Sequence, residues 1–331
     1  MIISRTPVRV SFFGGGTDYP GFYKREQGLV LGATINKYVY VSVNRNSQFF
    51  DYTTRISYRR TELVASINEI EHPSVKACLN YMGIDEPLDI NIFSDLPART
   101  GLGSSSAFTV GLLNALYALK GRAVSPKRLS EEACHIEQVL IGENVGSQDQ
   151  YHAAHGGLNV ISFSKEDCSV EPVVTSVDKM SLLQESWMMF FTGITRFADP
   201  LLKEQVERTA MKQNDDQLFT MLDYVRRGRA IFSDSATEAF LQDFGCLLDD
   251  AWELKKKLSS KVSNELIDDY YSKARLAGAF GGKLSGAGSG GFLSFIVPPE
   301  KKQAVRAALN DLKELSFKID SRGSSIIYSN E

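Results

Sequence analysis

Three segments rich in glycine and serine constrain this chain more than any other feature, because glycines let a backbone approach a ligand closely. They are FGGGTD at 13–18, PARTGLGSSSA at 97–107 and GGKLSGAGSGG at 281–291. The second segment lies between an alternating stretch, 88–94, and an apolar stretch that runs from about residue 105 to 119. This order predicts a strand, a turn and a helix, whose unpaired N–H groups and positive dipole end favour a bound phosphate.

Other phosphate-binding motifs do not fit the sequence. A Walker loop needs GxxxxGK[ST], but Gly282 and Lys283 are followed by Leu284. The string GAGSGG at 286–291 matches GxGxxG, yet it leads into the strand-like segment FLSFIV instead of opening a helix. The sequence also lacks the HRD and DFG elements of protein kinases.

The composition is that of an ordinary globular protein. The chain has 331 residues, 43% of them hydrophobic and 23% charged, which is enough for two domains with well-buried cores. Its net charge is −3 and it has no basic arm or lysine-rich tail, so nucleic acid is not an expected partner.

The spacing of the cysteines and the hydropathy of the chain predict the cellular compartment of the protein. The four cysteines are widely spaced and form no CxxC pair, which disfavours a zinc site or a disulfide framework and fits a reducing compartment. The amino terminus lacks the apolar core of a signal peptide, and no apolar run approaches the roughly 20 residues that cross a bilayer. We expect a cytoplasmic protein without membrane contact, present as a monomer or homodimer.

Mixed strand and helix patterns predict an α+β protein of two domains. Around 164–186 the sequence is polar and loses its periodicity. We therefore expect an N-terminal domain at 1–183 and a C-terminal domain at 184–331. A strand is expected at 187–193 and a charged, helix-rich section at 199–276.

Local patterns predict further elements. A pair of strands is expected within 29–43, where β-branched and aromatic residues are frequent. Ser125 is a suitable N-cap for a helix that runs to about Leu140. The segment GENVGSQDQYHAAHGG, 142–157, is expected to be a loop. The last two expected elements are a helix near 300–314 and a strand at 324–329.

The three glycine-rich segments, in this order, resemble the motifs of the GHMP superfamily of small-molecule kinases, which includes galactokinase, homoserine kinase, mevalonate kinase and phosphomevalonate kinase. The likeness covers nearly the whole chain, since the motifs fall at residues 4–20, 97–108 and 281–295. It implies an N-terminal domain of a kind also seen in a ribosomal protein, a ferredoxin-like C-terminal domain, and an active site in the cleft between them.

Further segments narrow the resemblance within the superfamily. SRTPVRVSFFGGGTDYP, INKY, GSQDQY and GGKLSGAGSGGF look most like members that phosphorylate the anomeric hydroxyl of a seven-carbon sugar phosphate. Such a reaction leads toward a nucleotide-activated sugar for surface polysaccharide. The expected substrates are therefore ATP and a sugar phosphate.

The resemblance implies ATP and Mg²⁺ as cofactors. Its phosphate loop corresponds to Gly101, Leu102, Gly103, Ser104, Ser105 and Ser106. Ser105 matches the serine that binds magnesium in relatives, and Glu137 best matches the helical glutamate that completes the metal site. Because the intervening loop is one residue longer than in mevalonate kinase, Glu143 is the alternative ligand.

The resemblance also assigns the catalytic pair and the sugar site. Asp149 falls at the position of the family's catalytic aspartate, Arg9 at that of an arginine near it, and Asp18 at that of an aspartate that holds sugar hydroxyls. Gly15 and Gly16 replace a glutamate and a histidine of galactokinase, which removes two sugar contacts and disfavours galactose. The residues expected beside the substrate are Gly14, Gly15, Gly16, Thr17, Asp18, Gly286 and Gly288.

These assignments predict in-line transfer of the γ-phosphoryl group. Asp149 would accept the proton of the anomeric hydroxyl, while Arg9 keeps Asp149 ionised and neutralises charge on the transferred group. Positioning and charge stabilisation by the metal and the loop amides would supply most of the catalysis. Without the resemblance, Asp149 reads as a loop-capping residue, Glu137 as a solvated helix charge and Arg9 as an ordinary strand residue.

A substrate that already has a phosphate requires cations away from the reacting hydroxyl, and arginine forks suit phosphate best. The candidates lie in or near the motifs or in a basic strand: Arg5, Lys37, Arg55, Arg59, Arg60, Arg99 and Lys283. Lys37, Arg99 and Lys283 are favoured because they lie within or beside glycine-rich motifs. A solvated surface charge is the competing interpretation for each of them.

The sequence leaves alternative functions open. One is an anomeric kinase for another sugar, such as L-fucose, or a different metabolite kinase of the superfamily. Another is a non-catalytic sugar sensor on the same fold, which the presence of Ser105, Glu137 and Asp149 disfavours. His152 and His155 follow Asp149 at intervals of three, but zinc is not expected because the chemistry needs only magnesium with oxygen ligands. One histidine is expected to pack and the other to touch substrate.

Overall fold

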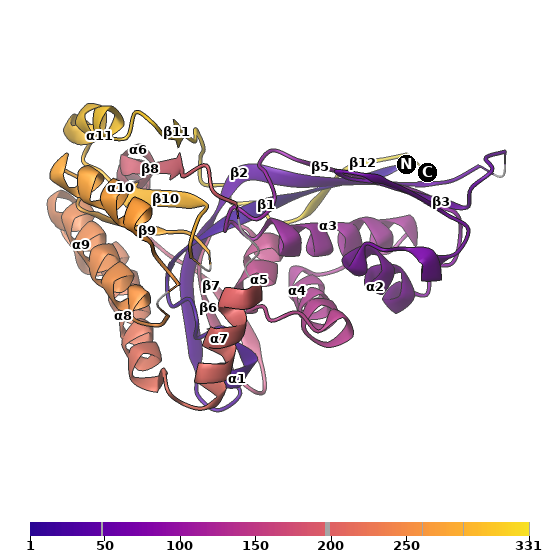
Figure 1. Cartoon of the computed structure of the whole chain (residues 1–331), viewed down its shortest axis with the longest axis horizontal. Helices are drawn as coiled ribbons and strands as arrows, with labels where there is room; N and C mark the ends of the chain where they lie inside the picture. Colours follow the sequence, from indigo (N-terminus) through magenta and orange to yellow (C-terminus); the bar gives the residue numbers. More distant parts are fainter. Residues whose placement is uncertain (48, 196–198, 260, 287, 331) are drawn as a thin grey trace.

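The computed structural model describes residues 1–47, 49–195, 199–259, 261–286 and 288–330. In these parts of the chain the strands form two sheets, one of eight strands and one of four, and helices cover both (Figure 1). This is the α+β arrangement that the sequence predicts. Across the same residues, none of the helices has the length and apolar character that a membrane span requires.

The first sheet is built on two long strands, β1 (Ile2–Phe13) and β2 (Gly28–Arg45). They pair antiparallel along most of their length, with register shifts between Pro7 and Val8 and between Ser11 and Phe13. The main path of the sheet is β12-β1-β2-β5-β3-β4, and β6 and β7 branch from β2. The other bounds are β3 (Thr54–Ser57), β4 (Thr61–Val64), β5 (Leu88–Ser94), β6 (Leu158–Phe163), β7 (Cys168–Pro172) and β12 (Ser325–Ser329).

The predicted pair of strands within 29–43 is wrong, because β2 is one continuous strand. Its first part, 28–33, pairs with β6, and its last part, 39–45, pairs with β5. Each half therefore has a separate partner on the same side, while β1 spans both halves on the other side. The change of partner explains why the sequence resembles two strands.

Helices cover one face of the first sheet (Figure 1). They are α2 (Pro73–Met82), α3 (Ser104–Leu119), α4 (Pro126–His135) and α5 (Gln148–His155). Helix α3 contacts both β1 and β2 on one side and α2, α4 and α5 on the others, so nearly all of its residues are buried. This position explains its apolar sequence without a polar stripe.

Two predicted elements near the glycine-serine turn differ from the structure. The segment 142–157 was expected to be a loop, but it contains α5, which places Asp149 in the first turn of a helix. The helix after Ser125 begins as predicted, since the Ser125 hydroxyl accepts the Arg128 N–H, but it becomes a π-helix at Ile136–Ile141. A π-turn holds one more residue than an α-turn, so the spacing of residues after it changes.

The second sheet has the order β11-β8-β10-β9 and is antiparallel throughout. Its strands are β8 (Trp187–Phe191), β9 (Gly281–Leu284), β10 (Phe292–Ile296) and β11 (Lys313–Glu314). Its helices are α6 (Val177–Ser186), α9 (Thr237–Lys256), α10 (Glu265–Leu276) and α11 (Lys302–Ala308). Helix α8 (Asp215–Asp234) packs against α9 and against β1 and β2 of the first sheet, and α1 (Pro20–Tyr23) contacts α7 (Asp199–Ala210). The helix predicted near 300–314 is shorter than expected because β11 begins at Lys313.

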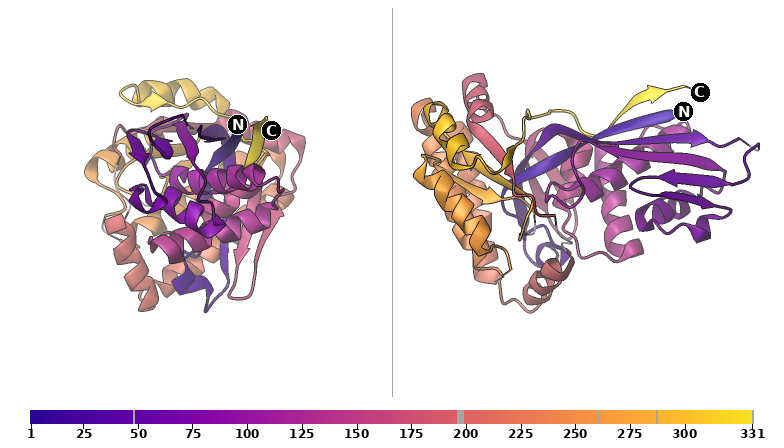
Figure 2. Two further views of the ribbon diagram at one scale, coloured as in Figure 1. Left: turned by 90° about the vertical axis from the view of Figure 1, so that its right-hand side faces the viewer. Right: turned by 45° about the horizontal axis from the view of Figure 1, so that its top comes forward.

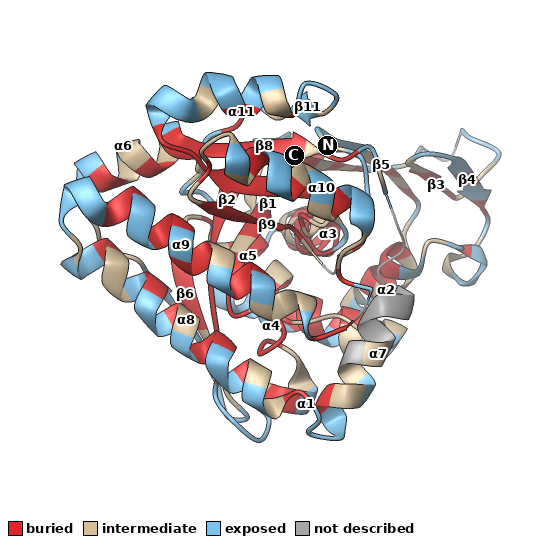
Figure 3. Cartoon of the chain, turned by 60° about the vertical axis from the view of Figure 1, so that its left-hand side comes forward, coloured by how far each residue is buried: buried red, intermediate tan, exposed pale blue. Residues whose placement is uncertain are grey.

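An aromatic cluster joins the two sheets. The Phe12 ring of β1 lies 4.8 Å from the Trp187 ring of β8 and 5.2 Å from the Phe244 ring of α9. All three belong to one apolar core that includes residues from both sheets. Figure 3 shows the same pattern, with the inward stripes of α8 and α9 buried and their outward stripes exposed.

The chain returns to the first sheet at its end. After β11, residues 315–324 lead to β12, which pairs antiparallel with β1, so both ends of the described chain lie side by side (Figure 2). The division expected at 183/184 assigned this last strand to the C-terminal domain, and on this point it is corrected. The pairing of β12 with β1 joins residues 320 or more positions apart, which local sequence patterns do not reveal.

Candidate active site

All three glycine-rich segments reach one cavity, which residues of both domains line. Its volume is about 1010 Å³. The first segment contributes Gly14, Gly15, Gly16 and Asp18, the second Gly101, Gly103 and the serines 104–106, and the third Lys283, Gly286 and Gly288. The predicted convergence of the three motifs is therefore observed in the structure.

The second and third segments pack backbone to backbone. A Cβ on Gly286, where φ is +76°, would lie 2.4 Å from the Gly101 Cα. A Cβ on Gly291 would lie 2.3 Å from the Thr100 carbonyl oxygen. Only glycine permits these distances, so part of the glycine content serves to join the two domains at the cavity.

The second segment forms the start of helix α3. Gly103 is the N-cap, with φ of 73°, and Ser104 is the first helical residue. The N–H groups of this first turn have no partner within the helix, and the dipole favours an anion there. Ser105 is exposed in the cavity, whereas the Leu102 side chain is buried and its carbonyl accepts the Arg9 N–H at 3.0 Å. Leu102 thus anchors the loop to β1 and does not face a ligand.

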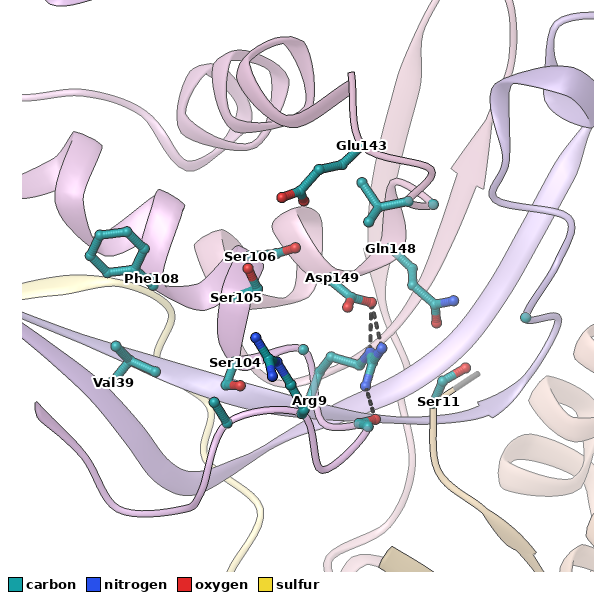
Figure 4. A pocket seen from close by; sticks show the side chains of 18 of the residues that line it. Arg9, Ser11, Val39, Ser104, Ser105, Ser106, Phe108, Glu143, Gln148 and Asp149 are labelled. Carbon is teal, nitrogen blue, oxygen red and sulfur yellow. Dashed lines mark hydrogen bonds and ion pairs between the residues drawn. The ribbon is translucent and has the colours of Figure 1, made fainter. Parts of the chain in front are cut away.

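Arg9 and Asp149 form an ion pair beside this loop. Two nitrogens of Arg9, Nε and Nη2, lie 2.8 and 2.6 Å from Asp149 Oδ1, and Nη1 donates to the Gly101 carbonyl at 2.7 Å (Figure 4). The Arg9 residue is 7% exposed and the Asp149 side chain 23% exposed. Asp149 also lies against the loop, because a Cβ on Gly103 would lie 2.9 Å from Oδ2. A carboxylate, a guanidinium and the helix terminus therefore meet at one point.

The first glycine-rich segment forms the adjoining wall. Asp18 is fully buried and accepts the Gly16 N–H at 2.9 Å and the Gln148 Nε2–H at 3.0 Å. Burial raises its pKa, the Gly16 hydrogen bond opposes that shift, and the Asp149 charge adds to it. Thr17, expected to bind substrate, is fully buried, with its hydroxyl 2.8 Å from the carbonyl oxygens of Gly14 and Leu29. Thr17 holds the loop together and does not line the cavity.

Glu137, the expected metal ligand, lies behind the loop in the π-helix. It is 1% exposed and does not line the cavity. Its Oε2 accepts the Ser106 hydroxyl at 2.8 Å and the Gln150 amide, and its Oε1 has no hydrogen-bond partner among the described residues. Burial raises the pKa of Glu137 to about 7, although the hydrogen bonds from Ser106 and Gln150 oppose the shift.

Glu143, the alternative metal ligand, lines the cavity. Figure 4 shows its side chain directed toward the space in front of Ser105 and Ser106. The π-helix that contains Glu137 ends at Ile141, directly before the loop that contains Glu143. Glu137 lies outside the cavity lining and Glu143 within it, and the assignment of Glu137 as a metal ligand stays a prediction.

Two lysines of the second domain reach the wall formed by the first segment. Lys283 of β9 is 7% exposed and donates to the Phe12 carbonyl at 2.9 Å. Lys255 of α9 donates to the carbonyls of Gly286 and Leu284. Burial lowers the pKa of Lys255 to about 8, and the Arg9 charge contributes to that shift. Sequence reasoning missed Lys255, since the run Lys255–Lys257 at a helix end resembles a solvated charge cluster.

Of the other residues expected to contact substrate, some line the cavity and others do not. Arg99 lines the cavity, as do Arg59 and Arg60. Lys37 lies in β2 outside the cavity lining, so its expected contact with substrate is not supported. His152 and His155 also lie outside the cavity lining. His152 is fully buried, and burial lowers its pKa to about 3, so the position of the histidines does not support the expected contact with substrate.

The cavity has an apolar end and a polar end. Figure 4 shows Val39 and Phe108 at one end, the serines of the loop in the middle, and Gln148 and Ser11 at the other end beyond Arg9 and Asp149. Ile92, Phe93 and Tyr58 also line the cavity. Sequence reasoning did not identify these residues, which come from separate strands without a shared motif. In the described chain, no group of three or more His, Cys, Asp or Glu side chains could hold a metal by itself.

This geometry, with a helix terminus for phosphates and an arginine-held carboxylate beside it, defines a small-molecule kinase of the type that the motifs resemble. Residues 68–157 match the GHMP kinases N terminal domain, and residues 236–314 match the GHMP kinases C terminal domain. The chain is 30% identical over 333 residues to the D-glycero-alpha-D-manno-heptose 7-phosphate kinase of Campylobacter jejuni, with 96% of each chain covered. The chain therefore belongs to the GHMP kinases, which use ATP as phosphate donor.

Two further comparisons extend this result. The chain is 24% identical over 340 residues to a bifunctional fucokinase/GDP-fucose pyrophosphorylase of Arabidopsis thaliana, which covers 95% of this chain and 31% of that longer protein. A crystal structure of a D-glycero-D-manno-heptose 1-phosphate kinase from Bacteroides thetaiotaomicron superimposes with a TM-score of 0.75 at 24% identity, covering 99% of this chain and 100% of the other. This superposition confirms the predicted two-domain GHMP-kinase fold.

Proposed function

We propose that this protein transfers the γ-phosphoryl group of ATP to the anomeric hydroxyl of D-glycero-D-manno-heptose 7-phosphate, giving the 1,7-bisphosphate. The observation that supports it most directly is the Arg9–Asp149 ion pair beside the N-terminus of α3 in one cavity. The 30% identity to the heptose 7-phosphate kinase of Campylobacter jejuni supports the choice of sugar. In this proposal the product leads toward nucleotide-activated heptose for surface polysaccharide.

The donor half of the site suits ATP. The N–H groups of the first turn of α3 and the hydroxyls of Ser104 and Ser105 would bind the phosphates. The apolar end, with Val39 and Phe108, would hold the base, since flat apolar surfaces favour aromatic rings. The Arg99 guanidinium lines the cavity and would add positive charge near the phosphates.

The donor set near the serines fits Mg²⁺. Magnesium prefers oxygen ligands, and the Ser105 hydroxyl and the Glu143 carboxylate line the same cavity. Glu137 has a buried carboxylate oxygen without a partner among the described residues, and it contacts Ser106 next to Ser105. We assign Ser105 and Glu143 as ligands, with Glu137 supporting the loop. When bound, the ion would neutralise charge on the β- and γ-phosphates.

The acceptor half places a base next to the phosphates. Asp149 would accept the proton of the anomeric hydroxyl as the oxygen attacks the γ-phosphorus, and Arg9 would stabilise the carboxylate and the transferred phosphoryl group. An anomeric hydroxyl is more acidic than an ordinary alcohol, so a carboxylate is a sufficient base. A positioned base contributes about 10²–10⁴-fold to the rate.

A distal phosphate on the sugar would compensate the positive charge at the polar end of the cavity. We call this end the acceptor end, because in this proposal it binds the acceptor sugar. Burial lowers the pKa of both Lys255 and Lys283, and the nearby Arg9 charge adds to each shift. Buried cations of one sign are costly unless an anion accompanies them. The 7-phosphate of the sugar is such an anion. This proposal replaces Lys37 with Lys255 in the set favoured from the sequence.

A second candidate is an anomeric kinase for L-fucose, which the likeness to the Arabidopsis thaliana fucokinase supports. The lysines at the acceptor end favour a phosphorylated sugar over fucose. A sugar sensor without activity is a third possibility, and the intact Arg9–Asp149 pair argues against it.

An acceptor panel tests the proposal. Purified protein with ATP and Mg²⁺ would be given heptose 7-phosphate, unphosphorylated heptose, L-fucose, D-galactose and mevalonate, with ADP release and ³¹P NMR as readouts. We expect the highest kcat/KM for heptose 7-phosphate, with a new anomeric phosphate signal. Preference for L-fucose would replace the substrate assignment, and saturable sugar binding without ADP release would replace catalysis with sensing.

A further inference from the structure

Two buried polar atoms at the acceptor end have no partner in the protein. The Ser11 hydroxyl and the Gln148 side-chain oxygen, Oε1, are both inaccessible and make no hydrogen bond with any described residue. Both residues line the cavity, and Figure 4 shows them on the same side of it, next to Arg9 and Asp149. Buried polar atoms are almost always hydrogen-bonded in native proteins, to protein or to ordered water, so each of these two atoms is expected to bond a water or a ligand atom.

Gly15 lies beside the side chains of Ser11 and Gln148 and has no side chain of its own to occupy the space there. A Cβ on Gly15 would lie 3.7 Å from Gln148 Nε2 and 3.9 Å from Ser11 Oγ. These are ordinary contact distances, and Gly15 is not among the glycines with positive φ. The backbone therefore does not require glycine at this position. The absent side chain instead provides room that Ser11 and Gln148 border.

Asp18 fixes the orientation of the Gln148 amide. Gln148 Nε2 donates to Asp18 Oδ2 at 3.0 Å, and the Gln148 backbone N–H lies 3.3 Å from the same oxygen. A flipped amide would bring two oxygens together, so the acceptor Oε1 must be the atom turned away from Asp18. The residue is 9% exposed, which leaves it little freedom to rotate.

We propose that Ser11 Oγ and Gln148 Oε1 form a subsite for one hydroxyl group of the acceptor sugar, and that Gly15 sets its size. A hydroxyl donates to Gln148 Oε1 and accepts from the Ser11 hydroxyl at the same time, which satisfies both atoms. An anion would face the Asp18 carboxyl, and a cation would face the charges of Arg9 and Lys255. A neutral group with a donor and an acceptor is therefore the best match.

This subsite rests on the proposed sugar kinase function and adds selectivity to it. A site built to hydrogen-bond a hydroxyl rejects an analogue that lacks the hydroxyl, because its own polar atoms are then left unpaired. Asp149, the proposed base, directly follows Gln148 in the first turn of α5. The subsite thus fixes the sugar at a position next to the reacting group.

The replacement Ser11→Ala tests the hydroxyl contact. It removes the Ser11 hydroxyl, which has no described protein partner, so the apo protein should not lose thermal stability. We expect equilibrium binding of the acceptor sugar, measured by calorimetry, to weaken by about tenfold, the typical effect of one lost hydrogen bond. Binding of an ATP analogue should change less than twofold.

The replacement Gly15→Ala tests whether the space beside Gly15 holds a hydroxyl group of the sugar. The added methyl fits beside Ser11 and Gln148 without a clash in the apo protein, but it fills the subsite. We expect unchanged stability and at least tenfold weaker sugar binding. Gly21→Ala is the matched control, since an added Cβ there meets nothing within 4 Å and Gly21 does not line the cavity.

The acceptor is first identified from wild-type turnover, so a wrong sugar assignment appears in the wild-type panel and not in the variants. If Ser11→Ala lowers thermal stability and leaves sugar affinity unchanged, the hydroxyl has a structural role and the subsite is rejected. If Gly15→Ala binds the sugar as tightly as Gly21→Ala does, the space does not hold a substrate group. Weaker sugar binding in both variants, with nucleotide binding retained, supports the subsite.

Discussion

Arg9 holds Asp149 against the phosphate loop: its Nε and Nη2 lie 2.8 and 2.6 Å from one carboxylate oxygen, and its Nη1 donates to the Gly101 carbonyl at 2.7 Å. A single guanidinium thus fixes the distance between the proposed base and the loop that would hold the triphosphate. Phosphoryl transfer depends mainly on such positioning.

The replacement Asp149→Asn should reduce kcat by about 10²–10⁴-fold, because it removes the proposed base while keeping the shape of the side chain. Binding of an ATP analogue should persist, since the loop amides are unchanged. Steady-state turnover and calorimetry measure the two effects. A variant that keeps the wild-type rate would exclude Asp149 as the base.

Magnesium dependence should distinguish Glu143 from Glu137. We expect Ser105→Ala and Glu143→Gln to raise the Mg²⁺ concentration for half-maximal activity by about tenfold, because each removes an oxygen that lines the cavity. Glu137→Gln should change it much less, since Glu137 lies behind Ser106. Activity titrated with Mg²⁺ after chelation provides the measurement. The reverse order of the two glutamate variants would restore Glu137 as the ligand.

The buried Glu137 should make stability depend on pH. Its pKa is raised from 4.5 to about 7 by burial, so between these values the folded state keeps a proton that the unfolded chain has lost. The stabilisation is complete below about pH 4.5 and is lost as the pH rises to about 7. The loss is on the order of 3 kcal/mol by the usual conversion. Glu137→Gln lacks this ionisation.

Thermal melting of wild type and Glu137→Gln in metal-free buffer at pH 5 and pH 8 measures this effect. The variant should gain stability relative to wild type at pH 8. Equal differences at both pH values would show that Glu137 is not protonated preferentially in the folded state.

The replacement Lys255→Met should raise the KM for the phosphorylated sugar by tenfold or more, while the KM for ATP stays within about threefold. Unphosphorylated heptose should be affected little, because it lacks the anion that Lys255 would bind. Lys256→Met is the matched control on the same helix, since Lys256 pairs with Glu253 at 2.7 Å and does not line the cavity. A KM effect on ATP alone would assign Lys255 to the nucleotide.

The motifs predicted the centre of the site well. Glycine density, the loop between a strand and an apolar helix, and the family resemblance identified Arg9, Asp149 and the serine loop, which the structure brings to one cavity. These residues could be found because each lies inside a short sequence motif. The helical start of α5 was missed because its glycines and polar residues favour a loop, whereas tertiary packing against α3 and α4 stabilises a helix.

The rest of the site depends on features that local sequence does not encode. Glu137, the expected metal ligand, lies in a π-helix and outside the cavity lining, a position that the sequence pattern did not predict. Lys255 comes from a charged helix end whose position is set by α9 packing on β9. Lys37 was favoured as a phosphate contact because it is near a motif in the sequence. In the structure it belongs to β2 and lies outside the cavity lining.

The return of β12 to the first sheet affects how the protein unfolds. The chain passes between the two sheets twice, and the Phe12, Trp187 and Phe244 rings bind the halves together. A cut at residue 183 would leave the first half without an edge strand and with an exposed aromatic surface. Neither half should then fold alone, and the intact chain should melt in one cooperative transition.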